Sequence, residues 1–386
     1  MALHGRILSL RQDPECLHYR AIFPSPSDNA PPSPELTYPP SISATEDDTL
    51  DLIQHYFNLK PNLTQLYEQW ASADANFKKK APKFTGVRIL KQDAWEALIG
   101  FICSSNNNIA RISQMVHKLC VNYGPLIGHM DQEAYHDFPS PKALTDPKVE
   151  QQLRQLGFGY RAKYIWQTAV MVAKKEEIWL DSLRNPESPV MGVEPRSGGE
   201  WKVEGRDGYR TAHGELVTLQ GVGPKVADCV CLMGLGWGEA VPVDTHGEYK
   251  LSRALKIDAN LVLVWQIAQR DYKFGKGKHS SLTKATYDAV ANKFRTLWGK
   301  EAGWAHSVLF TADLKAFSER LVAKTEETTV KAEVTNDQKG NIKIEEVAET
   351  REVVEKKVKR LPEEDEHTEL EVRDKVVRKS KRQRRT

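Results

Sequence analysis

The stretch "YRTAHGELVTLQGVGPKVADCVCLMGL", residues 209–235, is the most informative part of this sequence for predicting its fold. Its first part has the apolar spacing of an amphipathic helix, "QGVG" is a tight turn, and Pro224 suits the first position of a second helix. The pattern predicts a helix–hairpin–helix within residues 208–235. The predicted phosphate-binding turn is Gly221, Val222 and Gly223. Its glycines let backbone N–H groups approach a DNA phosphate without interference from Cβ atoms, helped by the dipole of the following helix.

Lys225 stands at the entrance of the second helix and has two interpretations. In the first it only contacts a phosphate, as many helix–hairpin–helix units do. In the second it attacks carbon, which requires a neutral amine, and apolar neighbours together with the positive helix end disfavour its ammonium form. The glycine- and proline-rich connection 236–246 can return Asp244 to Lys225, where a carboxylate can stabilise an oxocarbenium-like sugar. Alternatively, Asp244 simply caps a helix.

The pattern along the chain changes three times. Residues 1–23 alternate like strands, and residues 24–43 are too rich in proline for a helix or a central strand. From about Asp48 onward the apolar spacing is helical, with a Pro/Gly-rich insertion at 186–208. We therefore predict a mainly α protein with three parts: a β-rich segment 1–47, a helical domain 48–323, and a tail 324–386.

The tail lacks aromatic residues and carries abundant mixed charge, so we expect it to be disordered. Its basic clusters at 356–360 and 378–385 could be nuclear localisation signals or patches that contact phosphate. Alternatively, they only make the tail soluble. We expect a nuclear protein, with a mitochondrial pool as the alternative.

Composition narrows the class of protein. The 386 residues carry 28% charged side chains and a net charge of +3, and no apolar run reaches the roughly 18 residues of a membrane span. The start lacks the apolar region of a secretory signal. Five scattered cysteines without Cys-x-x-Cys spacing indicate reduced thiols, and we expect no metal, no cofactor and no membrane partner.

The motifs together resemble a known family. "FICSSNNNIARI" (101–112), "GFGYRAKY" (157–164), "GVGPKVADCVCLMGL" (221–235), "VPVDTH" (241–246), "WQIAQRDY" (265–272) and "AGWAHSVLFTADL" (302–314) are similar to the helix–hairpin–helix/Gly-Pro-Asp DNA glycosylases, specifically the 8-oxoguanine DNA glycosylase/lyases of fungal type. The resemblance spans most of residues 1–323. It implies that fold, preceded by a truncated α+β (TBP-like) domain.

The resemblance also implies an activity and a partner. Lys225 would attack C1′ of the damaged nucleoside, expel 8-oxoguanine and cleave the strand by β-elimination, with Asp244 as its electrostatic partner. The lesion base would be flipped out of damaged double-stranded DNA. Four further residues match positions around that base: Cys229 and Phe310 on its faces, His306 where relatives often carry Gln at its Watson–Crick edge, and His246 near a phosphate.

The opposite strand has its own candidate residues. Three consecutive amides, 106–108, begin a helix and are good capping and base-contacting groups. By resemblance, Asn106 would fill the gap left by the flipped base, Arg111 and Arg161 would read the orphaned cytosine, and Tyr160 would wedge the stack. The alternatives are an ordinary Asn N-cap and a loop with one buried ring.

Two features depart from the family. The family's "Gly-Gln-Ser-Phe-Arg-Trp"-like segment does not occur here, and "GEYKLSRALKIDANLVL", residues 247–263, separates "VDTH" from "WQIAQRDY". We hypothesise that the sequence carries a retained intron and a misplaced start codon, which sequencing the transcript would test.

Three rival functions follow. The first is a glycosylase for alkylated bases or adenine mispairs, which typically uses Asp-activated water and would not need Lys225. The endonuclease-III-like branch of such enzymes often carries a four-cysteine cluster near its C-terminus, and no cysteine follows Cys231 here. A catalytically impaired DNA-binding protein on the same frame is the main alternative. A purely structural helical scaffold leaves Lys225 and Asp244 unexplained. We expect a monomer, since nothing in the sequence indicates an oligomer.

Overall fold

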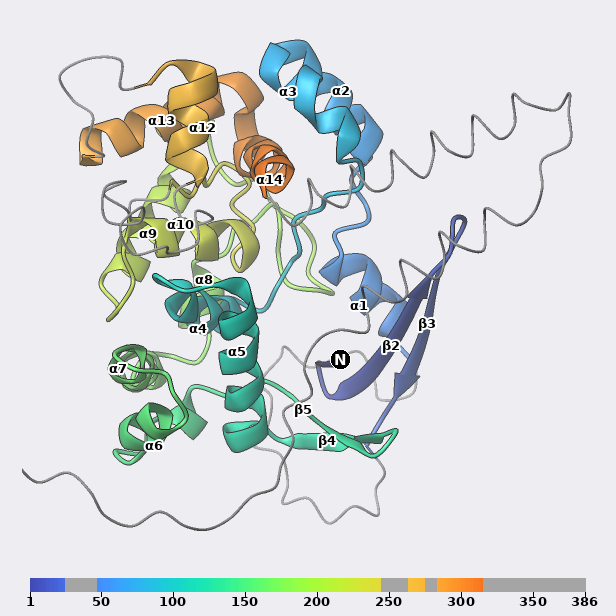
Figure 1. Ribbon diagram of the computed structural model, residues 1–386, viewed down its shortest axis with the longest axis vertical. Coiled ribbons are helices and arrows are strands. Elements are labelled where there is room, and N and C mark those ends of the chain that lie inside the picture. The colour runs from blue at the N-terminus through green and yellow to red at the C-terminus, as the bar shows by residue number, and fades with distance from the viewer. Residues whose placement is uncertain (25–46, 244–262, 275–282, 315–386) are drawn as a thin grey trace, which may run out of the picture. The chain divides into compact units, whose positions relative to one another are not determined.

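The computed structural model describes residues 1–24, 47–243, 263–274 and 283–314. All of them belong to a compact unit, Met1–Ala323, and the remaining unit is Lys324–Thr386. The described part is mainly helical, with a small antiparallel sheet at the N-terminus and a separate β-hairpin (Figure 1). The predictions that fall on residues 24–43, 247–263 and the tail therefore lie largely outside the described residues.

The N-terminal sheet has the order β1–β2–β3. Its strands and the helix that covers it are β1 (Ala2–Leu3), β2 (Arg6–Gln12), β3 (Leu17–Ile22) and α1 (Thr49–Tyr56). Leu3 and Leu8 bury their side chains against Leu52 and Ile53 of α1, which forms a small core of its own. Arg6 donates to the Asp48 carboxylate at 2.6 Å, which joins the sheet to the start of α1. The strand pattern predicted for residues 1–23 is confirmed.

The helices that follow form the main core. They are α4 (Ala94–Ser104), α5 (Ile109–Tyr123), α6 (Val149–Gln155), α7 (Arg161–Ala173), α8 (Trp179–Ser182), α9 (Asp207–Val217) and α10 (Pro224–Met233), with a 3-10 turn η2 (Lys142–Leu144). Asp93 caps α4 and Asn108 caps α5, each through its side-chain oxygen. Leu98, Ile99 and Ile102 of α4 are fully buried, and α4 packs against α10. The helix that carries Lys225 therefore rests on the centre of the core.

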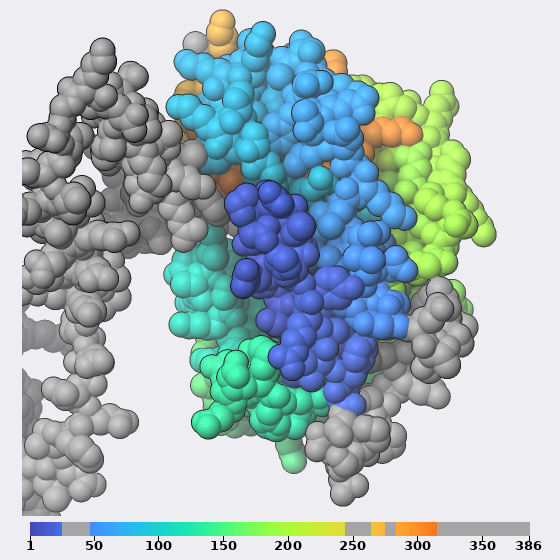
Figure 2. All heavy atoms as spheres, turned by 90° about the vertical axis from the view of Figure 1, so that its right-hand side faces the viewer, coloured from blue at the N-terminus to red at the C-terminus, as the bar shows by residue number. Residues whose placement is uncertain are grey.

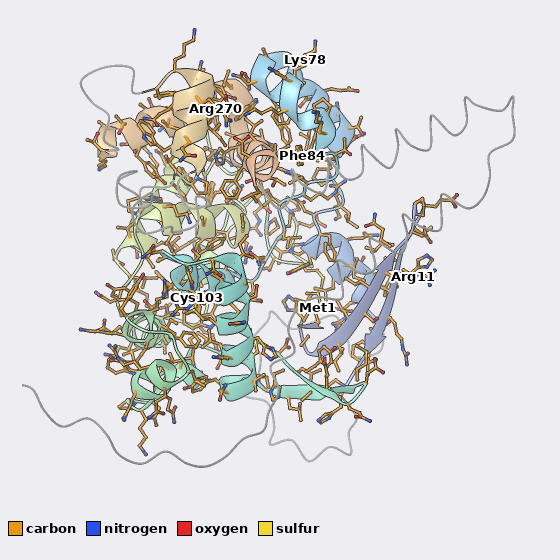
Figure 3. The ribbon with its side chains drawn as sticks, in the orientation of Figure 1. Met1, Arg11, Lys78, Phe84, Cys103 and Arg270 are labelled. Carbon is orange, nitrogen blue, oxygen red and sulfur yellow. The ribbon has the colours of Figure 1, made fainter. Side chains whose placement is uncertain are left out.

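A second group of helices packs at one end of the unit. It comprises α2 (Leu63–Ala73), α3 (Ala75–Lys80), α12 (Leu263–Tyr272), α13 (Lys284–Trp298) and α14 (Ala302–Asp313), with the 3-10 turns η1 (Ala81–Lys83) and η4 (Gly299–Glu301). Phe77 makes edge contacts with Trp70 and Trp298. Lys80 of α3 donates to Asp271 of α12 at 2.6 Å, so the helices carrying Lys78 and Arg270 in Figure 3 lie side by side.

A β-hairpin between α5 and α6 was missed by the sequence analysis. It pairs β4 (Leu126–Met130) with β5 (Glu133–His136), and its two turn residues, Asp131 and Gln132, both have positive φ. Figure 2 shows it beside the N-terminal sheet, where Asp137 accepts a hydrogen bond from the Gly5 N–H at 2.6 Å. Neither turn residue is glycine, so the usual hairpin signal is absent from the sequence.

Candidate functional site

The hairpin between α9 and α10 has the predicted helix–hairpin–helix form. Gly221 has φ +77°, a left-handed conformation that glycine adopts without strain, and a Cβ there would lie 2.7 Å from Cβ of Tyr164. The Thr168 hydroxyl of α7 donates to the Gln220 carbonyl at 2.8 Å. Val222 is buried, whereas Gly223 is exposed and directly precedes Pro224. The buried side of the hairpin therefore packs against α7, and Gly223 is exposed to solvent.

Lys225 lies in the first turn of α10, next to the exposed end of the hairpin. Its side chain is half-buried, and Val226 and Val230 on the same helix are buried, as predicted. Within the described part of the chain, no hydrogen bond or ion pair engages its Nζ atom. The geometry leaves this amine available at a helix N-terminus.

Asp228 is a buried carboxylate on α10, one turn after Lys225, that the sequence analysis did not select. Its Oδ1 accepts a hydrogen bond from the Tyr209 hydroxyl at 2.5 Å, and its Oδ2 accepts one from the Tyr287 hydroxyl. Burial raises the pKa of this carboxyl, while nearby His213 and the tyrosine hydrogen bonds act in the opposite direction. An aspartate on the apolar side of "KVADCV" was the available signal.

The predicted base pocket draws on α10 and α14. Cys229 is buried on α10, and His306 and Phe310 lie one turn apart on α14. The Gly303 N–H donates to the Gly238 carbonyl at 2.8 Å, and a Cβ at Gly303 would meet the Leu232 side chain at 2.7 Å. The two helices that carry these residues are thus in contact.

His306 is a buried polar residue of α14. It is 3% exposed, its ring lies 5.4 Å from that of Phe294, and neither ring nitrogen has a hydrogen-bond partner among the described residues. Burial lowers its pKa to about 4, so the imidazole is neutral near pH 7. A neutral imidazole has one donor and one acceptor nitrogen to offer.

Two further predicted residues, Asp244 and His246, lie outside the described residues. The last described position before them is Val243, which is fully buried.

The candidate residues for the opposite strand come together around one turn. Arg161 donates to the Asn106 carbonyl at 2.9 Å and, through Nε, to the Ser105 carbonyl at 3.1 Å. The Tyr160 hydroxyl donates to the same Ser105 carbonyl at 3.0 Å, and the Arg161 guanidinium lies 4.6 Å from the Tyr160 ring centre. Asn106 has φ +48°, so these bonds hold an exposed asparagine in a left-handed conformation. Tyr160 is 47% exposed, whereas Phe158 in the same stretch is fully buried, so "GFGYR" also fits the alternative of a loop with one buried ring.

Arg111 lies beside this turn and lines a hollow of about 430 Å³. It donates to the Gly157 carbonyl at 3.0 Å, and Lys118 donates to the Leu156 carbonyl at 3.0 Å. Asn108 caps α5 by accepting from the Arg111 N–H at 2.9 Å, so the amide run does supply an ordinary N-cap. The same run therefore caps a helix through Asn108 and leaves Asn106 exposed.

The described residues contain no cluster of His, Cys, Asp or Glu side chains that could hold a metal ion. None of the five cysteines, all of which lie in the described ranges, forms a disulfide. In the same described ranges, no helix has the length and apolar character that a membrane crossing needs.

Comparison with known proteins gives consistent matches. Residues 1–98 match the family model "8-oxoguanine DNA glycosylase, N-terminal domain", and residues 99–261 match "HhH-GPD superfamily base excision DNA repair protein". The chain is 38% identical over 280 residues to the N-glycosylase/DNA lyase of Saccharomyces cerevisiae and 36% identical over 266 residues to the N-glycosylase/DNA lyase OGG1 of Arabidopsis thaliana. Each alignment covers 68% of this chain, and they span 66% and 61% of the two relatives, less than two thirds of each.

Solved structures show the same fold. The 8-oxoguanine glycosylase/lyase of Clostridium acetobutylicum, in complex with double-stranded DNA containing cytosine opposite 8-oxoG, superposes with a TM-score of 0.55 at 21% identity, covering 78% of this chain and 80% of that one. MBOgg1 in complex with a low affinity DNA ligand gives a TM-score of 0.50 at 26% identity, covering 68% and 74%. The predicted fold class is confirmed.

Proposed function

Because the chain belongs to the 8-oxoguanine DNA glycosylases of the HhH-GPD superfamily of base excision DNA repair proteins, we propose that it excises 8-oxoguanine opposite cytosine and then cleaves the strand. The observation that carries the proposal is the placement of Lys225. A half-buried amine stands in the first turn of α10, beside a hairpin whose exposed Gly223 is free to approach a phosphate. Damaged double-stranded DNA is the proposed partner, and the proposed active form is a monomer.

The proposed reaction has two steps. The neutral Lys225 amine attacks C1′ of the damaged nucleoside, the bond from C1′ to the base nitrogen breaks, and the base leaves with that electron pair and takes up a proton. The nitrogen lone pair then opens the sugar ring by breaking the C1′–O4′ bond, O4′ takes up a proton, and a protonated Schiff base forms. Loss of a proton from C2′ next forms a C2′–C3′ double bond, while the phosphate leaves C3′ with the electron pair of the C3′–O bond. Asp244 is the proposed carboxylate that stabilises positive charge on the sugar, since such charge develops as the base departs.

His306 supports the proposed recognition of a base. Neither ring nitrogen has a partner within the described ranges, burial of unpaired polar atoms costs free energy, and a purine edge carries both donors and acceptors that can pair with them. Cys229 and Phe310 are the proposed contacts to the two faces of the flipped base, and His246 is the proposed contact to a phosphate.

The opposite strand is the proposed partner of the turn at Ser105 and Asn106. Arg161 uses Nε and one terminal nitrogen on backbone carbonyls, while Arg111 is exposed beside a hollow large enough for a base. In the proposal Arg111 and Arg161 recognise the unpaired cytosine, Tyr160 inserts into the stack, and Asn106 occupies the vacated position.

Borohydride trapping tests the proposal. The purified chain is incubated with an 8-oxoguanine:cytosine duplex and sodium borohydride, and a covalent protein–DNA adduct is expected. Lys225→Gln should lose the adduct and keep duplex binding, while Lys142→Gln, at an exposed lysine of η2, should keep both. Duplex binding without an adduct in the unsubstituted chain would instead indicate a DNA-binding protein with an impaired active site.

The basic clusters at 356–360 and 378–385 support a nuclear location, which we include in the proposal. Fluorescence microscopy of the tagged chain, with and without residues 378–385, tests it. An unchanged distribution would argue against that cluster as the address.

A further inference from the structure

We propose that Tyr287, together with Asp228, positions the backbone at Val243 relative to the helix that carries Lys225. The inference rests on the proposed function, because Val243 directly precedes Asp244, the proposed partner of Lys225. Tyr287 would thus be a positioning residue for the reaction, without touching the DNA.

Asp228 provides the fixed point on α10. Its side chain is fully buried, and both carboxylate oxygens accept hydrogen bonds, one from Tyr209 of α9 and one from Tyr287 of α13. Asp228 and Lys225 are three residues apart on the same helix, so they share one rigid backbone. A group that is held against Asp228 is therefore held relative to Lys225.

Tyr287 joins this point to the chain segment that leads to Asp244. Its hydroxyl donates to Asp228 and accepts a hydrogen bond from the Val243 N–H at 3.3 Å. A hydroxyl that donates to a carboxylate becomes a stronger acceptor, because the two bonds polarise each other. The Val243 side chain is also fully buried, which limits the freedom of this peptide further.

The start of α13 holds Tyr287 in place. Thr283 caps the helix in a reciprocal capping box with Thr286, the residue next to Tyr287. Further along α13, Arg295 donates to the Tyr209 hydroxyl at 3.1 Å and to the Glu239 carbonyl at 3.0 Å. The same helix therefore contacts the connection 236–246 at two points, Glu239 and Val243.

The charged and titratable groups that face Asp228 from neighbouring elements come from two helices, α9 and α13. His213 of α9 lies 3.8 Å from Oδ1 and also contacts the Pro224 carbonyl at 3.3 Å. Tyr209, Tyr287 and Arg295 complete the set. Among these groups only the Tyr287 hydroxyl bonds to Val243. Its removal deletes that contact together with one bond to Asp228, and Tyr209→Phe, which deletes the other tyrosine bond to Asp228, is the matched control.

Three tyrosine-to-phenylalanine variants test the proposal in the full chain. Tyr287→Phe removes the bond to Val243, Tyr209→Phe removes the other hydroxyl on the same carboxylate, and Tyr272→Phe removes an equivalent bond to Asp74 at a distance from α10. The measurements are hydrogen exchange of the Val243 amide with selective ¹⁵N-valine labelling, dissociation constants for a duplex containing an abasic-site analogue opposite cytosine, and single-turnover excision of 8-oxoguanine.

We expect Val243 amide exchange to rise about tenfold in Tyr287→Phe and to stay unchanged in Tyr209→Phe. We expect the single-turnover rate of Tyr287→Phe at saturating enzyme to fall about tenfold or more, because misplaced catalytic groups cost rate, with duplex affinity kept within about twofold. Tyr272→Phe should keep both rate and affinity within about twofold after correction for the folded fraction.

Two results would overturn the inference. Unchanged Val243 exchange in Tyr287→Phe would show that the hydroxyl does not hold this peptide, whatever the activity. Faster exchange with an unchanged excision rate would show that the hold has no role in the reaction. If the unsubstituted chain forms no borohydride adduct, the proposed function fails separately, and Val243 exchange still decides whether Tyr287 fixes the backbone.

Discussion

The two hairpin glycines should respond in opposite ways to alanine, although they are only two residues apart. Gly221 has φ +77°, and a Cβ there would lie 2.7–2.8 Å from three carbon atoms of Tyr164. Gly223 has φ −92°, and no atom lies within 4 Å of an added Cβ. Gly221 is thus required by the fold, whereas Gly223 is free to serve DNA contact.

The expected loss of stability follows from these contacts. A left-handed alanine costs roughly 1–2 kcal/mol, the contact with Tyr164 adds roughly 1–3 kcal/mol of overpacking, and reduced entropy of the unfolded chain returns about 0.4–1 kcal/mol. Gly221→Ala should therefore lower the free energy of unfolding by roughly 2–4 kcal/mol, and Gly223→Ala should change it by less than about 1 kcal/mol. Urea unfolding followed by tryptophan fluorescence measures both.

Duplex binding provides the complementary readout. In the proposed complex, a methyl group at Gly223 obstructs the approach of the hairpin N–H groups to a phosphate, so the dissociation constant should rise about tenfold. Gly221→Ala, measured at a temperature where it is folded, should bind more nearly like the unsubstituted chain. Equal stability losses in the two variants, or unchanged duplex affinity in Gly223→Ala, would contradict this prediction.

Three further predictions concern buried polar groups. Because the pKa of His306 is lowered from 6.5 to about 4, the folded state loses stability as the pH falls from 6.5 to 4, and His306→Gln should flatten that part of the unfolding free-energy profile. Glu96 shows the opposite sign, since burial and neighbouring Asp93 and Asp137 raise its pKa from 4.5 to about 7. Its contribution to stability is lost as the pH rises from 4.5 to 7, and Glu96→Gln should remove this loss in thermal unfolding across that range. Arg161→Lys cannot keep both carbonyl contacts, so we expect about 1–2 kcal/mol lower stability and weaker discrimination for cytosine in excision assays with each opposite base. The first two assignments would be contradicted if His306→Gln or Glu96→Gln left the pH dependence of stability unaltered. The third would be contradicted if Arg161→Lys kept the full preference for cytosine as the opposite base.

Local sequence was sufficient for the helices and for the hairpin. Apolar residues three and four positions apart predict α4, α5, α7, α9 and α10, because that spacing follows directly from helix geometry. Gly221 and Pro224 mark the turn and the start of α10 because their backbone preferences are intrinsic. The placement of Lys225 in the first turn of that helix needed no tertiary information.

Tertiary structure alone decided how the polar groups are partnered. The bond between Tyr287 and Asp228 joins residues 59 positions apart, and the bond between Val243 and Tyr287 spans 44 positions. The sequence selected His306 only through the family resemblance, and the burial of its ring nitrogens beside Phe294 became visible only in the packed core. Periodicity reports which face of an element is buried, because burial recurs with the geometry of that element. It carries no information about which distant residue meets that face, and such pairings arise only when the elements pack.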